Sequence, residues 1–123
     1  MSVYIAKTAK VEGNAKVEGN AKVEGKAEVR GIVSGNAIVR DKAMVEDFPI
    51  VCGSAIIEGD AHICGGATIE GNAKVKDSMV DSMIVRGDTN ILTAWLYGRG
   101  VIEGDVNISE GRFRFIHWWR DVP

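Results

Sequence analysis

Two residues that could take part in chemistry stand on either side of Ile63, in the segment His62-Ile63-Cys64. If this segment is an extended strand, His62 and Cys64 project from the same face, because side chains alternate along a strand. A histidine beside a thiol could activate Cys64 as a nucleophile. Both residue types also bind metals, although a metal site normally needs three or four ligands and this segment supplies two. Alternatively, the pair packs within an interface between subunits.

A second group of candidate residues lies in the last third of the sequence, where arginine and aromatic residues are concentrated. Flat aromatic rings stack on bases, and guanidinium groups pair with phosphates. The group therefore indicates a site for a small anionic or nucleotide-like ligand. Its members are Trp95, Tyr97, Arg99, Arg112, Arg114, His117, Trp118, Trp119 and Arg120. The same residues would equally suit a cap that covers the end of a repetitive fold.

The elements that position these residues come from a six-residue repeat, which is most regular in AKVEGNAKVEGNAKVEGKAEVRG, residues 9 to 31. Each repeat pairs a small residue with a β-branched residue two positions later, so the two face one side of a strand and the residue between them faces the other. A helix would spread the same pair around its axis. Glycine next to asparagine or aspartate favours a turn. Each repeat is therefore predicted to be a short strand and a corner, which must stack on other repeats to bury its apolar face.

These A-x-V-x-G-N repeats, over about residues 3 to 91, resemble those of the hexapeptide-repeat family. The resemblance implies an all-β fold, a single left-handed parallel β-helix (solenoid) in which three repeats make a coil of eighteen residues. We expect about six coils, with the repeat region at residues 1–91. The last irregular coils and an aromatic-rich C-terminal cap are expected at residues 92–123, in the same domain. Residues eighteen apart should stack.

The repeat spacing changes from six to ten residues at two places, between Ala27 and Ala37 and between Ala73 and Met83. Each change is either a pair of repeats shortened by two residues or a four-residue insertion at one corner. Beyond them we expect the inward-facing pairs to be Met83 and Val85, Thr89 and Ile91, Trp95 and Tyr97, with Val106 and Ile108 as one more repeat.

The outward positions, which are charged in the first repeats, become apolar in the middle of the sequence. By the eighteen-residue rule, Ile38 stacks with Ile56 and Met44 with His62. An exposed strip of this kind favours self-association. Hexapeptide-repeat proteins are commonly trimers with parallel axes, so the resemblance implies a homotrimer with an interface at Ile38, Met44, Ile50 and Ile56. Alternatively, these are scattered apolar residues of the kind that any surface tolerates.

The resemblance also implies an activity, because many hexapeptide-repeat proteins are acyltransferases that use coenzyme A or acyl carrier protein. In those enzymes a histidine near a subunit interface acts as general base, and His62 is the only histidine within the regular repeats. The carbonic anhydrases of the family use three metal-binding histidines, and this chain has two histidines in all. The monotonous first coils favour a non-catalytic oligomer, either a scaffold or a ligand binder at inter-subunit clefts without a cofactor. A coenzyme-A-dependent acyltransferase is the alternative.

The composition narrows the class of protein. A chain of 123 residues is sufficient for one domain. Its formal net charge of −2 makes nucleic acid an unfavourable partner. Two cysteines do not form a disulfide framework. The first residues lack the apolar run of a signal peptide, and no stretch is long enough to cross a membrane, so we expect a cytoplasmic protein.

Overall fold

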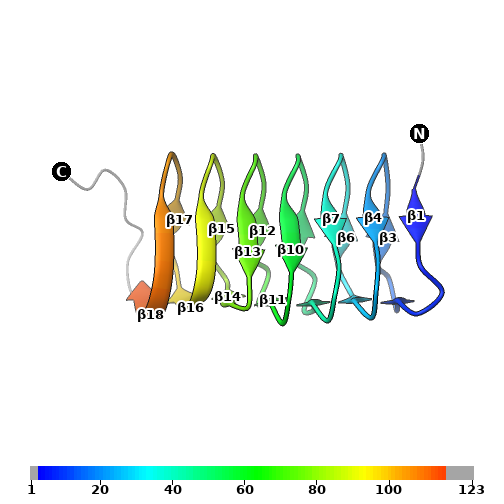
Figure 1. Cartoon of the computed structure of the whole chain (residues 1–123), viewed down its shortest axis with the longest axis horizontal. Helices are drawn as coiled ribbons and strands as arrows, with labels where there is room; N and C mark the ends of the chain where they lie inside the picture. The colour runs from blue at the N-terminus through cyan, green and yellow to red at the C-terminus, as the bar shows by residue number, and fades with distance from the viewer. Residues whose placement is uncertain (1–2, 116–123) are drawn as a thin grey trace.

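The computed structural model describes residues 3 to 115, which coil into a left-handed parallel β-solenoid (Figure 1). The chain runs down the near face in Figure 1, across the bottom and up the far face, while it advances from the N-terminal end on the right to the left. On its most complete face the solenoid stacks β1, β4, β7, β10, β13, β16 and β18. It therefore has about seven coils, close to the six expected. No helix between residues 3 and 115 is long and apolar enough to cross a membrane.

Three faces build each coil, and each face is a column of short parallel strands. The first face contains β1 (Tyr4–Ile5), β4 (Lys22–Val23), β7 (Ile38–Val39), β10 (Ile56–Glu58) and β13 (Lys74–Lys76). The second face contains β2 (Lys10–Val11), β5 (Glu28–Val29), β8 (Met44–Val45), β11 (His62–Cys64) and β14 (Met79–Asp81). The third face contains β3 (Lys16–Val17), β6 (Ile32–Val33), β9 (Ile50–Val51), β12 (Thr68–Ile69), β15 (Ile84–Val85) and β17 (Val101–Ile102). Strand β16 (Asn90–Gly98) bends from the first face onto the second, and β18 (Asn107–Phe115) follows it.

The interior is a narrow column made by the paired small and β-branched residues. In the pair Ala61 and Ile63, for example, both side chains are fully buried, and the same holds for Ala21 and Val23. The small residue leaves room for the backbone at the corner and the branched residue fills the centre of the triangle. Since a two-residue strand buries almost nothing by itself, the coils above and below supply the burial.

The eighteen-residue rule holds in seven of the sixteen strand pairings between residues 3 and 115, and the other nine pairings have separations of sixteen or seventeen residues. Lys10 lies beside Glu28, and Arg30 Nε donates a hydrogen bond to Glu12 Oε1 over 3.0 Å. Ile38 lies beside Ile56 and Met44 beside His62, also as predicted. Opposite charges are therefore neighbours at two outer positions of the second face, Lys10 and Glu12.

The two places of irregular spacing are shortened coils and not four-residue insertions. Gly31 and Val33 form a buried pair in the first of them, and Lys16 consequently lies beside Ile32, sixteen residues later. Ser78 and Val80 form the corresponding buried pair in the second. Gly31 fills its inward position because a Cβ there would lie 2.4 Å from the carbonyl oxygen of Pro49 in the next coil.

The expected inward pair Trp95 and Tyr97 is wrong by one residue. Ala94 and Leu96 are fully buried, whereas the Trp95 side chain is 46% exposed. The corner within β16 is one residue shorter than a regular corner, and Thr93 at this corner adopts a φ of 54°. Ala94 and Leu96 thus continue the alternation of a small residue with an aliphatic one, and both large aromatic rings are directed outward.

The last described strand continues the coil, and Val106 and Ile108 pack against the core as one more repeat, as predicted. Phe113 lies beside Leu96 in the inward column and is 39% exposed. Phe113 therefore covers part of the column's end. The remaining residues of the expected cap, 116–123, lie outside the described part of the chain.

Candidate ligand-binding site

Strands β16 and β18 bring together four of the residues that the sequence assigned to ligand binding. Trp95 lies beside Arg112 and Tyr97 beside Arg114 in the parallel register. Because Ala94 and Leu96 face inward, all four side chains project from the same outer surface. The Arg112 guanidinium carbon is 4.6 Å from the centroid of the Trp95 ring, a cation–π contact. We call these four residues the aromatic–arginine patch.

Arg112 and Arg114 of the aromatic–arginine patch differ from three other arginines of the solenoid, which are paired with glutamates. Arg30 pairs with Glu12 at 2.9 Å and Arg40 with Glu58 at 2.7 Å, and hydrogen bonds to these carboxylates raise the pKa of both guanidinium groups. Arg86 is paired in the same way with a glutamate of the next coil. Between residues 3 and 115, no carboxylate forms an ion pair with Arg112 or Arg114. Within the described part of the chain, both guanidinium groups are exposed and free of a carboxylate partner.

The other residues of the predicted ligand group are not brought into the patch by the described structure. Arg99 is exposed in the bend between β16 and β17. Four more lie outside the described residues: His117, Trp118, Trp119 and Arg120. The patch thus consists of two neighbouring aromatic–arginine pairs, which the sequence predicted by type but not by register.

His62 and Cys64 project from the outer surface of β11 on either side of the buried Ile63. The His62 Nε2 atom is 2.7 Å from Glu46 Oε2, on the coil below. In the stacking direction His62 lies between Met44 and Met79. A carboxylate that holds an imidazole in this way fixes the orientation of the ring, which is an arrangement that suits a general base. The sequence analysis missed Glu46, although it stands eighteen residues before Cys64 and so had to lie near His62.

The environment of Cys64 disfavours the nucleophile hypothesis. Burial, and next the negative charge of Asp81, raise the pKa of the Cys64 thiol to about 11. A nucleophilic cysteine needs the opposite shift, because the thiolate is the reactive form. The pKa of Cys52 is also raised, by burial and by Glu70. Among residues 3 to 115, no group of three or more histidine, cysteine, aspartate or glutamate side chains could hold a metal ion.

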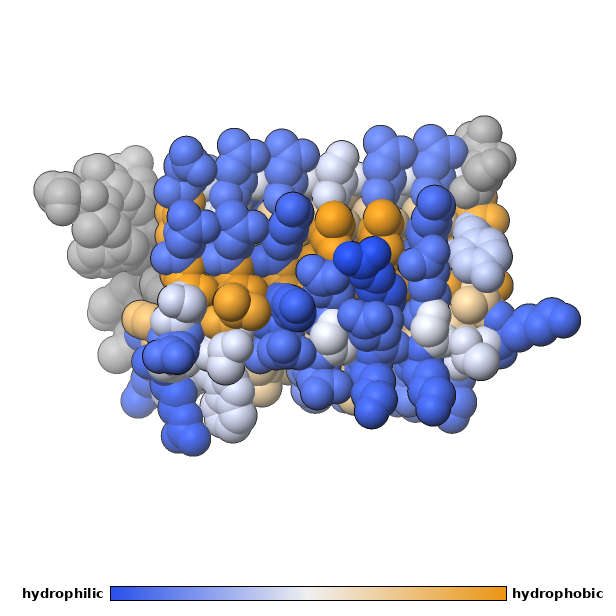
Figure 2. Space-filling model, viewed as in Figure 1, coloured by the Kyte–Doolittle hydropathy of each residue, from blue (hydrophilic) through white to orange (hydrophobic). Residues whose placement is uncertain are grey.

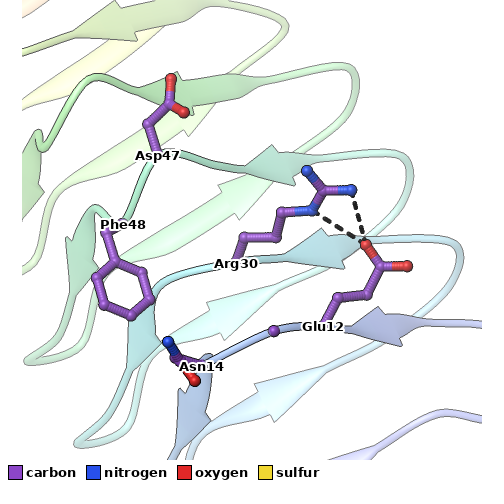
Figure 3. Close-up of a pocket in the computed structure, with 6 residues that line it drawn as sticks. Glu12, Asn14, Arg30, Asp47 and Phe48 are labelled. Carbon is purple, nitrogen blue, oxygen red and sulfur yellow. Dashed lines mark hydrogen bonds and ion pairs between the residues drawn. The ribbon is translucent and has the colours of Figure 1, made fainter.

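Two of the surface hollows lie at corners of the solenoid and are open to solvent. One, of about 570 Å³, is lined by Glu12, Gly13, Asn14, Arg30, Asp47 and Phe48 (Figure 3). Phe48 is 49% exposed and has a φ of 62°. It forms one wall of the hollow, and the Arg30–Glu12 ion pair forms another. The sequence analysis missed Phe48, although it is the only Phe, Tyr or Trp between positions 5 and 94.

The predicted interface residues lie on three faces. Ile38 and Ile56 stack on the first face, Met44 lies on the second, and Ile50 on the third, where it is 39% exposed. Apolar surface is visible over the middle coils of the first face, between charged columns (Figure 2). The third face carries a longer outward row that the sequence analysis missed. Its members are Ile32, Ile50, Thr68, Ile84 and Val101.

Comparison of the chain with models of protein families, with curated proteins and with solved structures finds no match. The function is therefore inferred from the residues on the outer surface of the solenoid.

Proposed function

We propose that this protein is a non-catalytic, self-associating β-solenoid that binds a small planar anion, such as a nucleotide, at the aromatic–arginine patch. The observation that carries the proposal is the register of Trp95 with Arg112 and of Tyr97 with Arg114. The six-residue period of the coils supports membership of the hexapeptide-repeat family.

The patch offers the two contacts that a nucleotide needs. An exposed ring such as Trp95 contributes about 1–3 kcal/mol when a base stacks on it. The charge-assisted hydrogen bonds from Arg112 and Arg114 to a phosphate are stronger than neutral ones. Since the described residues leave both guanidinium groups without an ion pair, an arriving phosphate displaces no carboxylate.

Self-association would give the patch walls that a single coil lacks. The outward row on the third face is β-branched in every described coil from β6 to β17. An apolar row of this length at a flat sheet surface supports an interface between copies. In a homotrimer with parallel axes, the clefts between neighbouring solenoids would run along the column of coils and reach the patch at one end.

Adenosine monophosphate is the probe that tests the patch. We expect the wild-type protein to bind it in isothermal titration calorimetry. Trp95→Ala and Arg114→Ala should each weaken binding by about tenfold, because one removes the stacking surface and the other a charged hydrogen-bond donor. Adenosine and inorganic phosphate, titrated separately, should each bind more weakly than the nucleotide.

Arg30→Ala is the matched control, because it also removes one exposed arginine but does so at the opposite end of the solenoid. It should leave nucleotide binding unchanged. Equal affinities for wild type, Trp95→Ala and Arg114→Ala would contradict the proposal, as would the absence of binding to the wild-type protein.

A coenzyme-A-dependent acyltransferase is the second candidate, and the His62–Glu46 pair favours it. With Nε2 bonded to the carboxylate, the other ring nitrogen of the half-exposed His62 is left to accept a proton from an acceptor hydroxyl or amine. The acyl group would then pass from the thioester sulfur to that oxygen or nitrogen, and coenzyme A would leave as the thiol. Met44 and Met79 flank the imidazole with apolar surface.

This second candidate predicts that the protein releases free thiol from acetyl coenzyme A in the presence of hydroxyl or amine acceptors. His62→Ala should lower kcat at least about a hundredfold, whereas Cys64→Ala should leave it unchanged. No thiol release from the wild-type protein across such acceptors, or full activity in His62→Ala, would rule the second candidate out.

A further inference from the structure

The N-terminal end of the solenoid exposes one free strand edge on each of its three faces. Among residues 3 to 115, strands β1, β2 and β3 each end their column, and each pairs with one neighbour, β4, β5 and β6 respectively. Free parallel edges of this kind are templates for further strand pairing.

The apolar column is also open at this end. The inward positions of the first coil are occupied by Ile5, Val11 and Val17. Ile5 is 43% exposed and the two valines are half-buried, whereas Val23 in the second coil is fully buried. No described residue covers these three side chains. The end is therefore an apolar triangle surrounded by three strand edges.

The backbone groups of the first coil show how a partner would attach. The outward residues Tyr4, Lys10 and Lys16 donate their N–H groups to the second coil. Because backbone groups alternate in direction along a strand, the intervening inward residues direct both N–H and C=O toward the open end. Ile5, Val11 and Val17 thus each offer one donor and one acceptor. In an antiparallel pair, such a residue exchanges both hydrogen bonds with the residue opposite.

We infer that two copies of this chain associate end to end through their first coils, head to head, around a two-fold axis at Val11. A two-fold axis makes the strands antiparallel, so Val11 of each copy exchanges two hydrogen bonds with Val11 of the other. Ile5 of each copy then meets Val17 of the other copy. The two open apolar triangles cover each other. This interface is separate from the aromatic–arginine patch, which lies at the opposite end of the solenoid.

The rise of the coil selects the axis at Val11. One coil advances about 4.8 Å, so the three strands of the first coil differ in height by about a third of this spacing from one to the next. Pairing the middle strand β2 with itself and the lowest strand β1 with the highest strand β3 gives the same separation on all three faces. An axis through β1 or β3 would leave the remaining faces out of hydrogen-bonding reach.

The charges of the first coil complement one another under this symmetry. Lys10 and Glu12 flank Val11 on the outer surface, so in the antiparallel pair each Lys10 stands opposite Glu12 of the other copy. Two symmetric ion pairs result. Each opposite-charge pair contributes about 0.2–1 kcal/mol at a sheet surface, and like charges in the same place repel.

Charge reversal tests the contact without touching the core. Lys10→Glu and Glu12→Lys should each raise the Kd for the end-to-end step by about tenfold in sedimentation equilibrium at low ionic strength, because each places like charges opposite at two sites. The double variant Lys10→Glu/Glu12→Lys should restore the wild-type Kd, since each new glutamate again faces a lysine. Lys22→Glu, the same charge change one coil further in, should have no effect.

The double variant also separates this interface from an effect on the chain itself. Within one chain Lys10 lies beside Glu28, and Glu12 pairs with Arg30. The double variant spoils both intramolecular contacts, so it would be the weakest associator if the effect arose from a distorted coil. A double variant that associates more weakly than either single variant would overturn the inference. Equal Kd values for the wild type, the two single variants and the double variant would overturn it too. Cross-linking of mixed ¹⁴N and ¹⁵N protein with a carbodiimide should yield a Lys10–Glu12 amide between copies, and only intramolecular links would overturn it too.

Discussion

Replacement of Ile57 by aspartate should lower the melting temperature by at least about 15 °C, or leave the chain unfolded at room temperature. Ile57 is fully buried at the centre of the fourth coil of the first face. A carboxyl group there would lie among aliphatic side chains without a hydrogen-bond partner, at a cost of about 4–5 kcal/mol. This cost is a large fraction of the stability of a typical domain. Circular dichroism at increasing temperature measures the effect.

Ile56→Asp is the matched control, because Ile56 precedes Ile57 on the same strand and faces outward. It makes the same chemical change in the same coil, with the carboxylate in water. The melting temperature should change by no more than a few degrees. If both variants were equally unstable, any charge in this strand would destabilise the protein. The assignment of inward and outward positions would then not explain the loss of stability.

Gly71→Ala should destabilise the protein by about 3 kcal/mol. Gly71 has a φ of 71°, a conformation that costs an alanine about 1 kcal/mol or more. A Cβ at this position would in addition lie 2.7 Å from the backbone nitrogen of Gly87 in the next coil. Two coils would have to move apart at that corner, and such overpacking costs about 1–3 kcal/mol. Urea denaturation gives the difference in the free energy of unfolding.

Gly13→Ala separates the two contributions. Gly13 has nearly the same φ, 64°, but no atom lies within 4 Å of the position of its missing Cβ. It should therefore lose only the conformational part, about 1 kcal/mol. If Gly13→Ala and Gly71→Ala were equally destabilised, contact between stacked corners would not limit the choice of residue at position 71.

The sequence predicted the solenoid well because its inward pairs recur at a spacing of six residues through most of the repeats. Once eighteen residues make a coil, the partner of Lys10 or of Ile38 follows by counting. The prediction failed where the separation changes. A coil shortened at Gly31 or at Ser78 changes the separation to sixteen or seventeen residues. The backbone conformation at the corner decides how many residues are lost, and the repeat pattern does not contain it.

The error at Trp95 has the same origin. Counting by six from Thr89 places Trp95 inside, but the corner at Thr93 uses five residues and places Ala94 there. Residue size was the better indicator, because the column accepts alanine and leucine and excludes an indole. For the candidate site, residue types predicted an aromatic and cationic group. The pairing of Trp95 with Arg112 depends on a coil of seventeen residues and could not be counted from the regular repeat.

The shortened corners show that a coil can lose one or two residues without a change in the axial length of the solenoid. Removing a few residues at a corner leaves the three faces aligned, as at Gly31 and Ser78, whereas removing one strand would turn every following residue onto the wrong face. Insertion or loss of a complete coil is therefore the smallest change in axial length that keeps every later residue on its face. Because the repeats between residues 9 and 31 are nearly identical, the gain or loss of a coil there would hardly change the side chains on the surface. The distance between the first coil and the Trp95–Arg112 pair can therefore change only in increments of one coil, about 4.8 Å.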